Sequence, residues 1–195
     1  MSKRQTIVAF GLLIVVGVVA RLVPHIPNFA PVTATALFCG VYMNRRLSLV
    51  APALVMALSD YMILYINPYG HTSFSHFYAP WLLWHSALPF VYLSFGVSAL
   101  VGWYTKSHRS GGVVVAAALL CSLQFFLITN AAVWIDGMYS RGIDGLYQSY
   151  VAALPFFRGT ALGDLFYTCV FFGLAEFVLG ALHSGREAPA TVAVT

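Results

Sequence analysis

The sequence predicts an all-α integral membrane protein with six transmembrane helices, and two features of its 195 residues carry this prediction. Hydrophobic residues make up 60% of the chain and charged residues only 8%, with a mean hydropathy of +0.82. A soluble domain carries charge on roughly a quarter of its residues, so this composition cannot cover a water-facing surface. The apolar residues also fall into six runs, and about 20 such residues span a bilayer. A water-soluble enzyme or DNA-binding domain is therefore excluded, and no nucleic-acid partner is expected.

The first three spans are expected at about 6–24, 29–43 and 47–66. The second is the shortest, and prolines interrupt the chain before it (PHIPNFAP, 24–31). An alternative for the first run is a cleavable signal peptide, because a basic start precedes the apolar stretch and Val18-Val19-Ala20 resembles a cleavage site. Cleavage would leave an odd number of spans and disturb the charge pattern described below.

The remaining spans are expected at about 81–104, 112–135 and 160–182. Together the six form a single membrane domain over 1–183, followed by a flexible cytoplasmic tail at 184–195. Between the last two spans, the 136–159 link is long enough to be functional, and its GLYQSYVAALPFF part is expected to form a short interfacial helix.

Basic residues indicate the orientation in the membrane. With a cytoplasmic N-terminus, seven Lys and Arg residues fall inside and three outside, which is the asymmetry of the positive-inside rule. Those inside are Lys3, Arg4, Arg45, Arg46, Lys106, Arg109 and Arg186, and those outside are Arg21, Arg141 and Arg158. We therefore expect a multi-pass protein of the cell inner membrane with both termini in the cytoplasm.

Polar side chains gather at the predicted outer ends of the spans. Such residues are costly at membrane depth and so indicate function. The outer set includes Arg21, His25, Asn28, Asp60, His85, Asn130, Asp136, Arg141, Asp144, Arg158 and Asp164, together with polar residues of the 67–80 link. Topology thus predicts a polar external cavity, with the aromatic 67–80 link as a lid over a partly apolar ligand.

Other interpretations of these residues stay open. Arg21 and Arg158 can extend to lipid headgroups, Asp60 can pair structurally with an Arg, and His85 can be a hydrogen-bonded packing residue. The three cysteines lie in apolar runs and are expected to pack as small hydrophobic residues without a disulfide. The chain contains no phosphate-binding GxxxxGK[ST] loop and no HExxH or CxxC metal motif.

Four motifs give the chain a resemblance to a known family. They are RLVPHIPNFAPV (21–32), ALSD (57–60), FFLITNAAVW (125–134) and LPFFRGTALGDLFY (154–167). With six short helices, these motifs resemble the substrate-binding S components of energy-coupling-factor vitamin transporters, and among them the solitary cobalamin-specific BtuM-like family. The resemblance implies an S-component-like helix bundle and uptake of a small molecule, with cobalamin or another corrinoid as the first candidate.

The resemblance also implies positions for the ligand contacts: His25, Asp60, Tyr78 and Arg141. The family's cobalt-ligating cysteine is missing, because the 67–80 link contains no Cys and Ser73 stands at the equivalent position. His71 and His76 flank that serine, and a neutral imidazole is a good cobalt ligand. The full predicted substrate-binding set is His25, Asn28, Asp60, Ser73, Phe74, Tyr78, Asn130 and Arg141. No cofactor of the protein itself is expected, since cobalamin would be the transported ligand.

A second departure concerns the energy source. S components that dock on a shared energising module carry small-xxx-small spacing in their first helix, and here Ala9, Gly11, Gly17 and Ala20 form no such pair. We expect a protein that works alone or docks differently.

The leading hypothesis is a non-enzymatic uptake protein. Alternatives are a membrane enzyme or accessory protein acting on a lipid or cofactor at the outer leaflet, with Asp60 and His25 as an acid–base pair, and a structural subunit.

Overall fold

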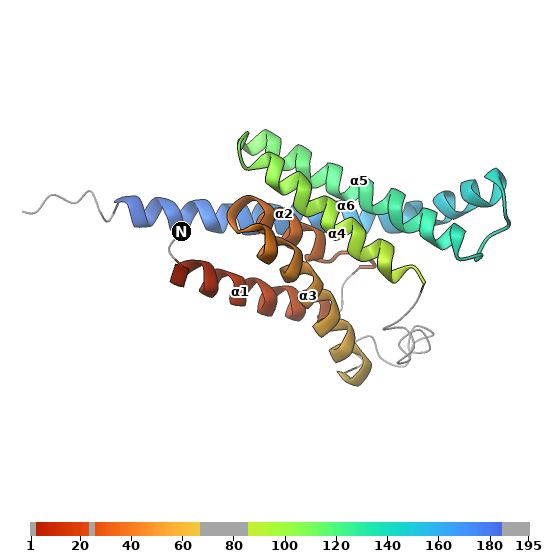
Figure 1. Cartoon of the computed structure of the whole chain (residues 1–195), viewed down its shortest axis with the longest axis horizontal. Coiled ribbons are helices and arrows are strands. Elements are labelled where there is room, and N and C mark those ends of the chain that lie inside the picture. Colours follow the sequence, from red (N-terminus) through yellow and green to blue (C-terminus); the bar gives the residue numbers. More distant parts are fainter. Residues whose placement is uncertain (1–2, 24–25, 67–85, 185–195) are drawn as a thin grey trace, which may run out of the picture.

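A computed structural model describes residues 3–23, 26–66 and 86–184 (Figure 1). These residues form helices and no strand, so the predicted all-helical fold is confirmed. The helices are α1 (Lys3–Leu22), α2 (Val32–Tyr42), α3 (Arg45–Ile66), α4 (Leu88–Thr105), α5 (Gly111–Ile135) and α6 (Ile143–Ser184). The predicted 67–80 lid, the start of the fourth span and the tail beyond 184 lie outside the described residues.

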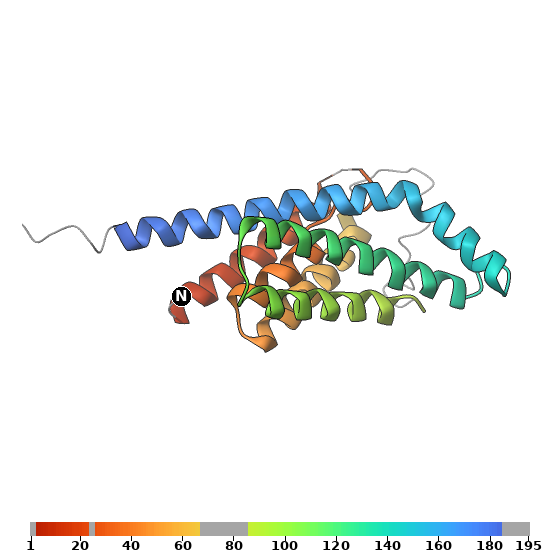
Figure 2. The same cartoon turned by 90° about the horizontal axis from the view of Figure 1, so that it is seen from above.

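Five of the six helices are long and apolar enough to cross a membrane, which confirms a multi-pass membrane protein. The exception is α2, whose 11 residues extend only about 16 Å, roughly half the thickness of the hydrocarbon core. This short helix lies at the centre of the bundle, and every residue from Val32 to Val41 is buried. The predicted span at 29–43 is thus a buried half-length helix, surrounded mainly by α3, α4 and α6 (Figures 1 and 2).

The shortness of α2 follows from the segment before it. Asn28 has a φ of 63°, a left-handed conformation that Asn tolerates better than most residues, and Pro31 precedes the first helical residue. The turn packs directly on α6: a Cβ atom added to Gly163 would lie 3.0 Å from both the Phe29 Cα and the Ala30 nitrogen. Irregular backbone is tolerated at membrane depth where protein covers it, and α6 provides that cover.

A close backbone contact joins α2 to α4. A Cβ atom on Gly40 would lie 2.6 Å from the Ala99 carbonyl oxygen, and one on Gly102 would lie 2.5 Å from the Leu37 carbonyl oxygen. Gly40 and Gly102 are therefore the small residues that let these two backbones approach. Around this contact lies an apolar core that includes Leu37, Phe38, Cys121 and Phe172.

The last helix differs most from the prediction. A span was expected at 160–182 after a long link, but α6 begins at Ile143 and runs for 42 residues, about 63 Å. The segment predicted as an interfacial helix is its first part, which packs along α5: the Tyr150 hydroxyl donates to the Leu127 carbonyl at 2.9 Å. Pro155 lies inside the helix, where a missing N–H favours a bend, and Figure 2 shows α6 bending in its first part.

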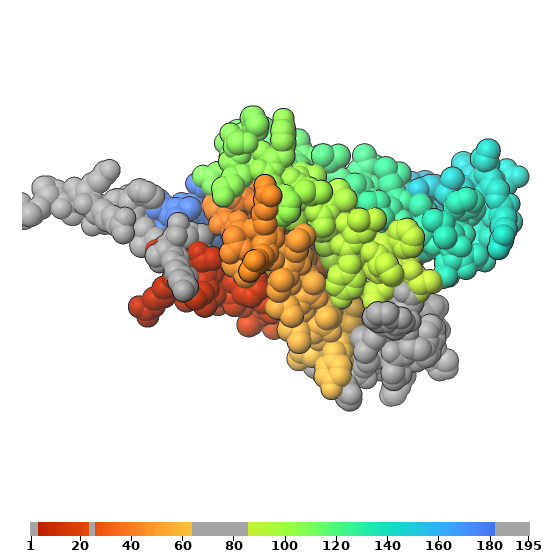
Figure 3. All heavy atoms as spheres, in the orientation of Figure 1, coloured from red at the N-terminus to blue at the C-terminus, as the bar shows by residue number. Residues whose placement is uncertain are grey.

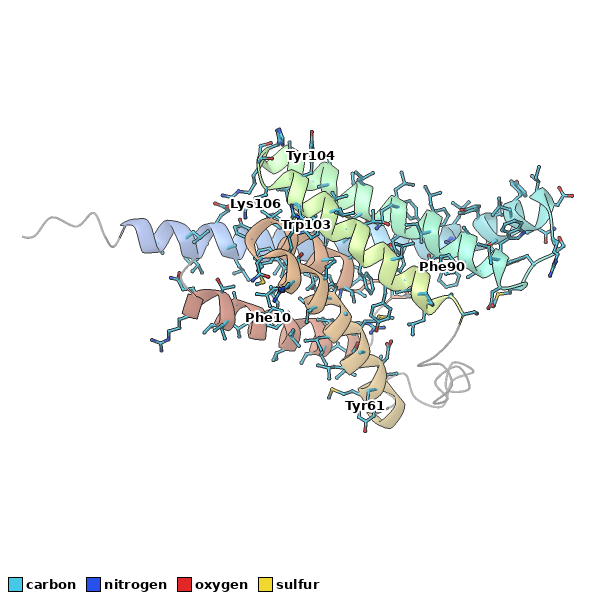
Figure 4. The ribbon with its side chains drawn as sticks, viewed as in Figure 1. Phe10, Tyr61, Phe90, Trp103, Tyr104 and Lys106 are labelled. Atoms are coloured by element: carbon cyan, nitrogen blue, oxygen red, sulfur yellow. The ribbon has the colours of Figure 1, made fainter. Side chains whose placement is uncertain are left out.

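One end of the bundle carries five basic residues, and we call it the basic end: Arg4, Arg45, Arg46, Lys106 and Arg109. Both terminal helices reach this end, α1 with its start and α6 with its finish (Figures 1 and 2). Trp103, Tyr104 and Lys106 lie together there, whereas Tyr61 and Phe90 mark the far ends of α3 and α4 (Figure 4). The far part of α3 projects from the body of the molecule, with α1 along its side (Figure 3).

Candidate functional site

The first polar cluster joins α1 to α3 in the half of the bundle away from the basic end. Arg21 Nη1 lies 2.7 Å from Asp60 Oδ1, and it also donates to the Ser59 hydroxyl and to the Met56 carbonyl. The side chains of Arg21 and Asp60 are 16% and 23% exposed, so the pair is largely but not fully buried. The structural alternative for Asp60, pairing with an Arg, is therefore realised in this structure.

The surroundings of this ion pair are mixed. A second apolar cluster contains Val55 and Val91 and includes Met56 and Tyr92 at its edge. Tyr92 of α4 interacts electrostatically with both Asp60 and Arg21. The far ends of α3 and α4 diverge from each other in both views (Figures 1 and 2). The pair thus offers a charged donor and a charged acceptor beside an apolar wall, a combination suited to an amphipathic ligand.

Other predicted site residues lie elsewhere. Asn28 is exposed and forms the turn before α2. Asn130 donates its side-chain amide to the Phe126 carbonyl at 2.7 Å, and its own carbonyl accepts from Ser149, so it supports the α5–α6 contact. Arg141 is exposed on the α5–α6 link, which lies away from the far half of α3 in both views (Figures 1 and 2). The structure does not bring Arg141 to Asp60.

The other predicted contacts fall outside the described residues. They are His25, Ser73, Phe74 and Tyr78 for the substrate, and His71 and His76 for a metal. Within the described ranges, no group of three or more His, Cys, Asp and Glu side chains is placed to hold a metal ion.

A second polar cluster, centred on Asp164, was not part of the predicted site. Asp164 is 2% exposed, and its Oδ2 lies 2.7 Å from the Ser122 hydroxyl of α5. It also hydrogen-bonds the Thr33 side chain of α2. The sequence placed Asp164 at the outer end of a span beginning near 160. Because α6 begins about 17 residues earlier, the residue lies deep between α2, α5 and α6.

Beside the Asp164 cluster, a glutamine joins α4 to α5. The Gln124 Nε2 atom donates to the Ser98 hydroxyl at 2.9 Å and to the Ser94 carbonyl at 3.1 Å, and the Ser94 hydroxyl donates to its oxygen at 3.0 Å. Cys121 hydrogen-bonds Ser98 and interacts electrostatically with Asp164, so the two groups lie near each other. Together these polar groups involve side chains of α2, α4, α5 and α6.

Two hollows are lined by described residues. One, of about 530 Å³, lies at the basic end and is lined by Val41, Tyr42, Lys106, Ser107, Arg109 and Leu179. Beside it, the Tyr42 hydroxyl donates to Glu176 at 2.6 Å, and Arg109 lies 3.3 Å from the same carboxylate. The other, of about 570 Å³, is an apolar groove between α1 and α6 with Arg4 at one end.

Comparison with known proteins gives one family. Residues 1–187 match the model of DUF6580, a family of unknown function, and the chain belongs to this family. No curated protein and no solved structure matches the chain.

Proposed function

We propose that this chain is a membrane-embedded binding and uptake protein for a vitamin-like or cofactor-like small molecule, with a corrinoid as the first candidate. The observation that carries the proposal is the Arg21–Asp60 ion pair, held 2.7 Å apart inside two candidate membrane spans and still partly exposed. Charged residues at membrane depth are costly and line ligand or ion pathways. The amides and phosphate of a corrinoid would use the guanidinium as donor and the carboxylate as acceptor, with Tyr92 beside them.

The proposed orientation places the basic end in the cytoplasm, because five described Lys and Arg residues gather there. Arg21 and Asp60 then lie in the outer half of the inner membrane, and both termini are cytoplasmic. The α5–α6 link with Arg141 projects on the outer side, where the arginine remains a predicted contact for a ligand on its way in.

No cofactor and no catalytic step belong to this proposal. Asp60 is paired with a guanidinium, which suits a fixed acceptor better than a general base. The protein would work alone or dock on an energising partner through a surface other than a small-xxx-small pair in α1. Any partner helix would meet α1, whose candidate span is mostly exposed, whereas Gly40 of α2 is already packed against α4.

The test is ligand binding by the purified protein in detergent. Native mass spectrometry identifies small molecules that co-purify, and corrin absorbance after incubation with cyanocobalamin or cobinamide measures binding. Replacing Asp60→Asn keeps the shape but removes the charged acceptor, and we expect at least tenfold weaker binding, about 1.4 kcal/mol.

Glu176→Gln at the basic end is the matched control and should bind as the parent does. If neither corrinoids nor co-purifying molecules bind, or if Asp60→Asn binds unchanged, the proposed site is wrong. Turnover of a lipid or cofactor without a stoichiometric bound ligand would support the enzyme alternative instead.

A further inference from the structure

We propose that Asp164 is a proton-binding site in the membrane interior, and that its neutral carboxyl joins α6 to α2 and α5. This inference goes beyond the uptake function and does not depend on it. Its basis is the position of the residue: three helices bury it to 2% exposure, and hydroxyl groups of α2 and α5 are bonded to it.

The hydrogen-bond partners suit a neutral acid. A protonated carboxyl has one O–H to donate and an oxygen to accept with, whereas an ionised one offers about four lone-pair positions to donors. Ser122 has a single hydroxyl proton, and its oxygen lies 2.7 Å from Asp164 Oδ2 and 3.1 Å from the Ala118 carbonyl. A protonated Asp164 donates to Ser122, Ser122 donates to Ala118, and Thr33 donates to the Asp164 carboxyl, so these three hydrogen-bonding groups are satisfied.

The charges around the residue favour the same state. The sequences of α2 and α5 contain no Lys, Arg or His, and the titratable groups that they contribute are Cys39, Tyr42 and Cys121. Of these, Cys121 interacts with Asp164, whereas Tyr42 is bonded to Glu176. On α6 itself Arg158 is exposed, and no described cation pairs with Asp164. An ionised carboxylate here would be a buried charge without a counter-ion, which is strongly unfavourable.

A hydroxyl that can respond to proton loss lies one helical turn away. Thr168 is 1% exposed, and its Oγ1 has no hydrogen-bond partner among the described residues. Residues four apart share a helix face, so its hydroxyl lies on the Asp164 side of α6. Loss of the proton would leave a negative charge between three helices. The Thr168 hydroxyl would then be available to donate a hydrogen bond to the carboxylate. The packing of α6 against α2 and α5 therefore depends on whether the proton is bound.

Infrared spectroscopy of the purified protein tests this directly. A protonated carboxyl in a dry site gives its own C=O band, distinct from the carboxylate bands. We expect this band at neutral pH in the parent, its disappearance as the pH is raised, and its loss in Asp164→Asn. Asp144→Asn, an exposed acid at the start of the same helix, and Cys121→Ser should both retain it. If Asp164→Asn does not fold, Ser122→Ala, which removes one partner, should shift the band.

Several results would overturn the proposal. One is a spectrum without the band at neutral pH; another is a band that survives in Asp164→Asn or is unmoved in Ser122→Ala. Carboxylate bands that respond when sodium replaces choline would assign the cluster to a metal cation instead of a proton.

Discussion

At the scale of single residues, buried hydroxyl groups are mostly satisfied by the carbonyl of the preceding turn. Ser59, Ser98 and Thr105 each donate to the carbonyl four residues earlier, at 2.6, 3.0 and 2.8 Å. Such bonds let polar side chains remain in an apolar helix at little cost. Ser94 and Ser149 instead donate across helices, to Gln124 and to the Asn130 carbonyl, and the Thr168 hydroxyl has no partner among the described residues.

Replacing Thr168→Val should stabilise the protein. A buried hydroxyl without a partner costs about 1–3 kcal/mol, and valine has nearly the same shape without the polar atom. Thermal unfolding in detergent should show a higher Tm. Thr160→Val is the matched control, because Thr160 donates to the Phe156 carbonyl at 3.3 Å and should gain nothing. A lower Tm for Thr168→Val would mean that the hydroxyl has a partner in the folded protein.

Removing one member of the Arg21–Asp60 pair should be more damaging than removing both. Asp60→Leu leaves the guanidinium without its counter-ion at membrane depth, and we expect a loss of about 3 kcal/mol. Arg21→Leu should cost a similar amount, and the double variant should recover a large part of it. Denaturation of the four proteins in one detergent measures this coupling energy. If the loss in the double variant equals the sum of the two single losses, the Arg21 and Asp60 side chains are not energetically coupled.

At the scale of helices, close packing is achieved by small residues at defined points. Gly40 and Gly102 let α2 and α4 touch backbone to backbone, and Gly17 of α1 lies against the Val55 side chain of α3. Helix association in a bilayer gains little from hydrophobic transfer and depends on such contacts. The buried position of α2 therefore depends on these glycines more than on its apolar character.

Gly102→Ala should destabilise the bundle by about 1–3 kcal/mol, because the new methyl group would overlap the Leu37 carbonyl and the backbone of Gly40. The matched control is Gly96→Ala on the same helix, where nothing lies within 4 Å of an added Cβ. Alanine is the better helix former, so this control should be neutral or slightly stabilising. Equal Tm values for the two variants would contradict the close α2–α4 contact.

At the scale of the whole molecule, the bundle has two different ends. The basic end gathers short links and both terminal helices, while the opposite end carries the long α5–α6 projection and the diverging ends of α3 and α4 (Figure 1). At 42 residues, α6 is about twice as long as a bilayer crossing requires, so part of it must extend beyond the membrane or be strongly tilted. This asymmetry suits a protein that receives a ligand on one side only.

Cysteine labelling tests which end faces outward. A membrane-impermeant maleimide should label Met138→Cys in intact cells, because this position on the α5–α6 link is 71% exposed. Ser107→Cys, on the α4–α5 link at the basic end, should react only after permeabilisation. Two native cysteines, Cys39 and Cys121, are buried, and Cys169, which is exposed on the apolar part of α6, is replaced by Ser as background for the labelling. Labelling of Ser107→Cys in intact cells, and of Met138→Cys only after permeabilisation, would contradict the proposed topology and support the opposite one.

The sequence alone was sufficient to predict a multi-pass helical membrane protein and the approximate places of α1, α3, α4 and α5. Apolar runs with few charges predict these helices from the local sequence alone, because a helix in lipid must make all its backbone hydrogen bonds within itself. The gathering of basic residues at one end was also predictable, because links alternate between ends when helices are antiparallel.

Tertiary structure alone decided the rest. Composition does not distinguish a half-length buried helix such as α2 from a crossing one, because the difference depends on the turn at Asn28 and the cover that α6 gives it. The sequence could name Arg21, Asp60 and Asp164 as costly polar residues, but not their partners. Asp60 meets a cation across the α1–α3 contact, and Asp164 meets hydroxyl groups of α2 and α5. Which groups face each other across helices depends on their relative rotation and depth, and packing between helices sets both.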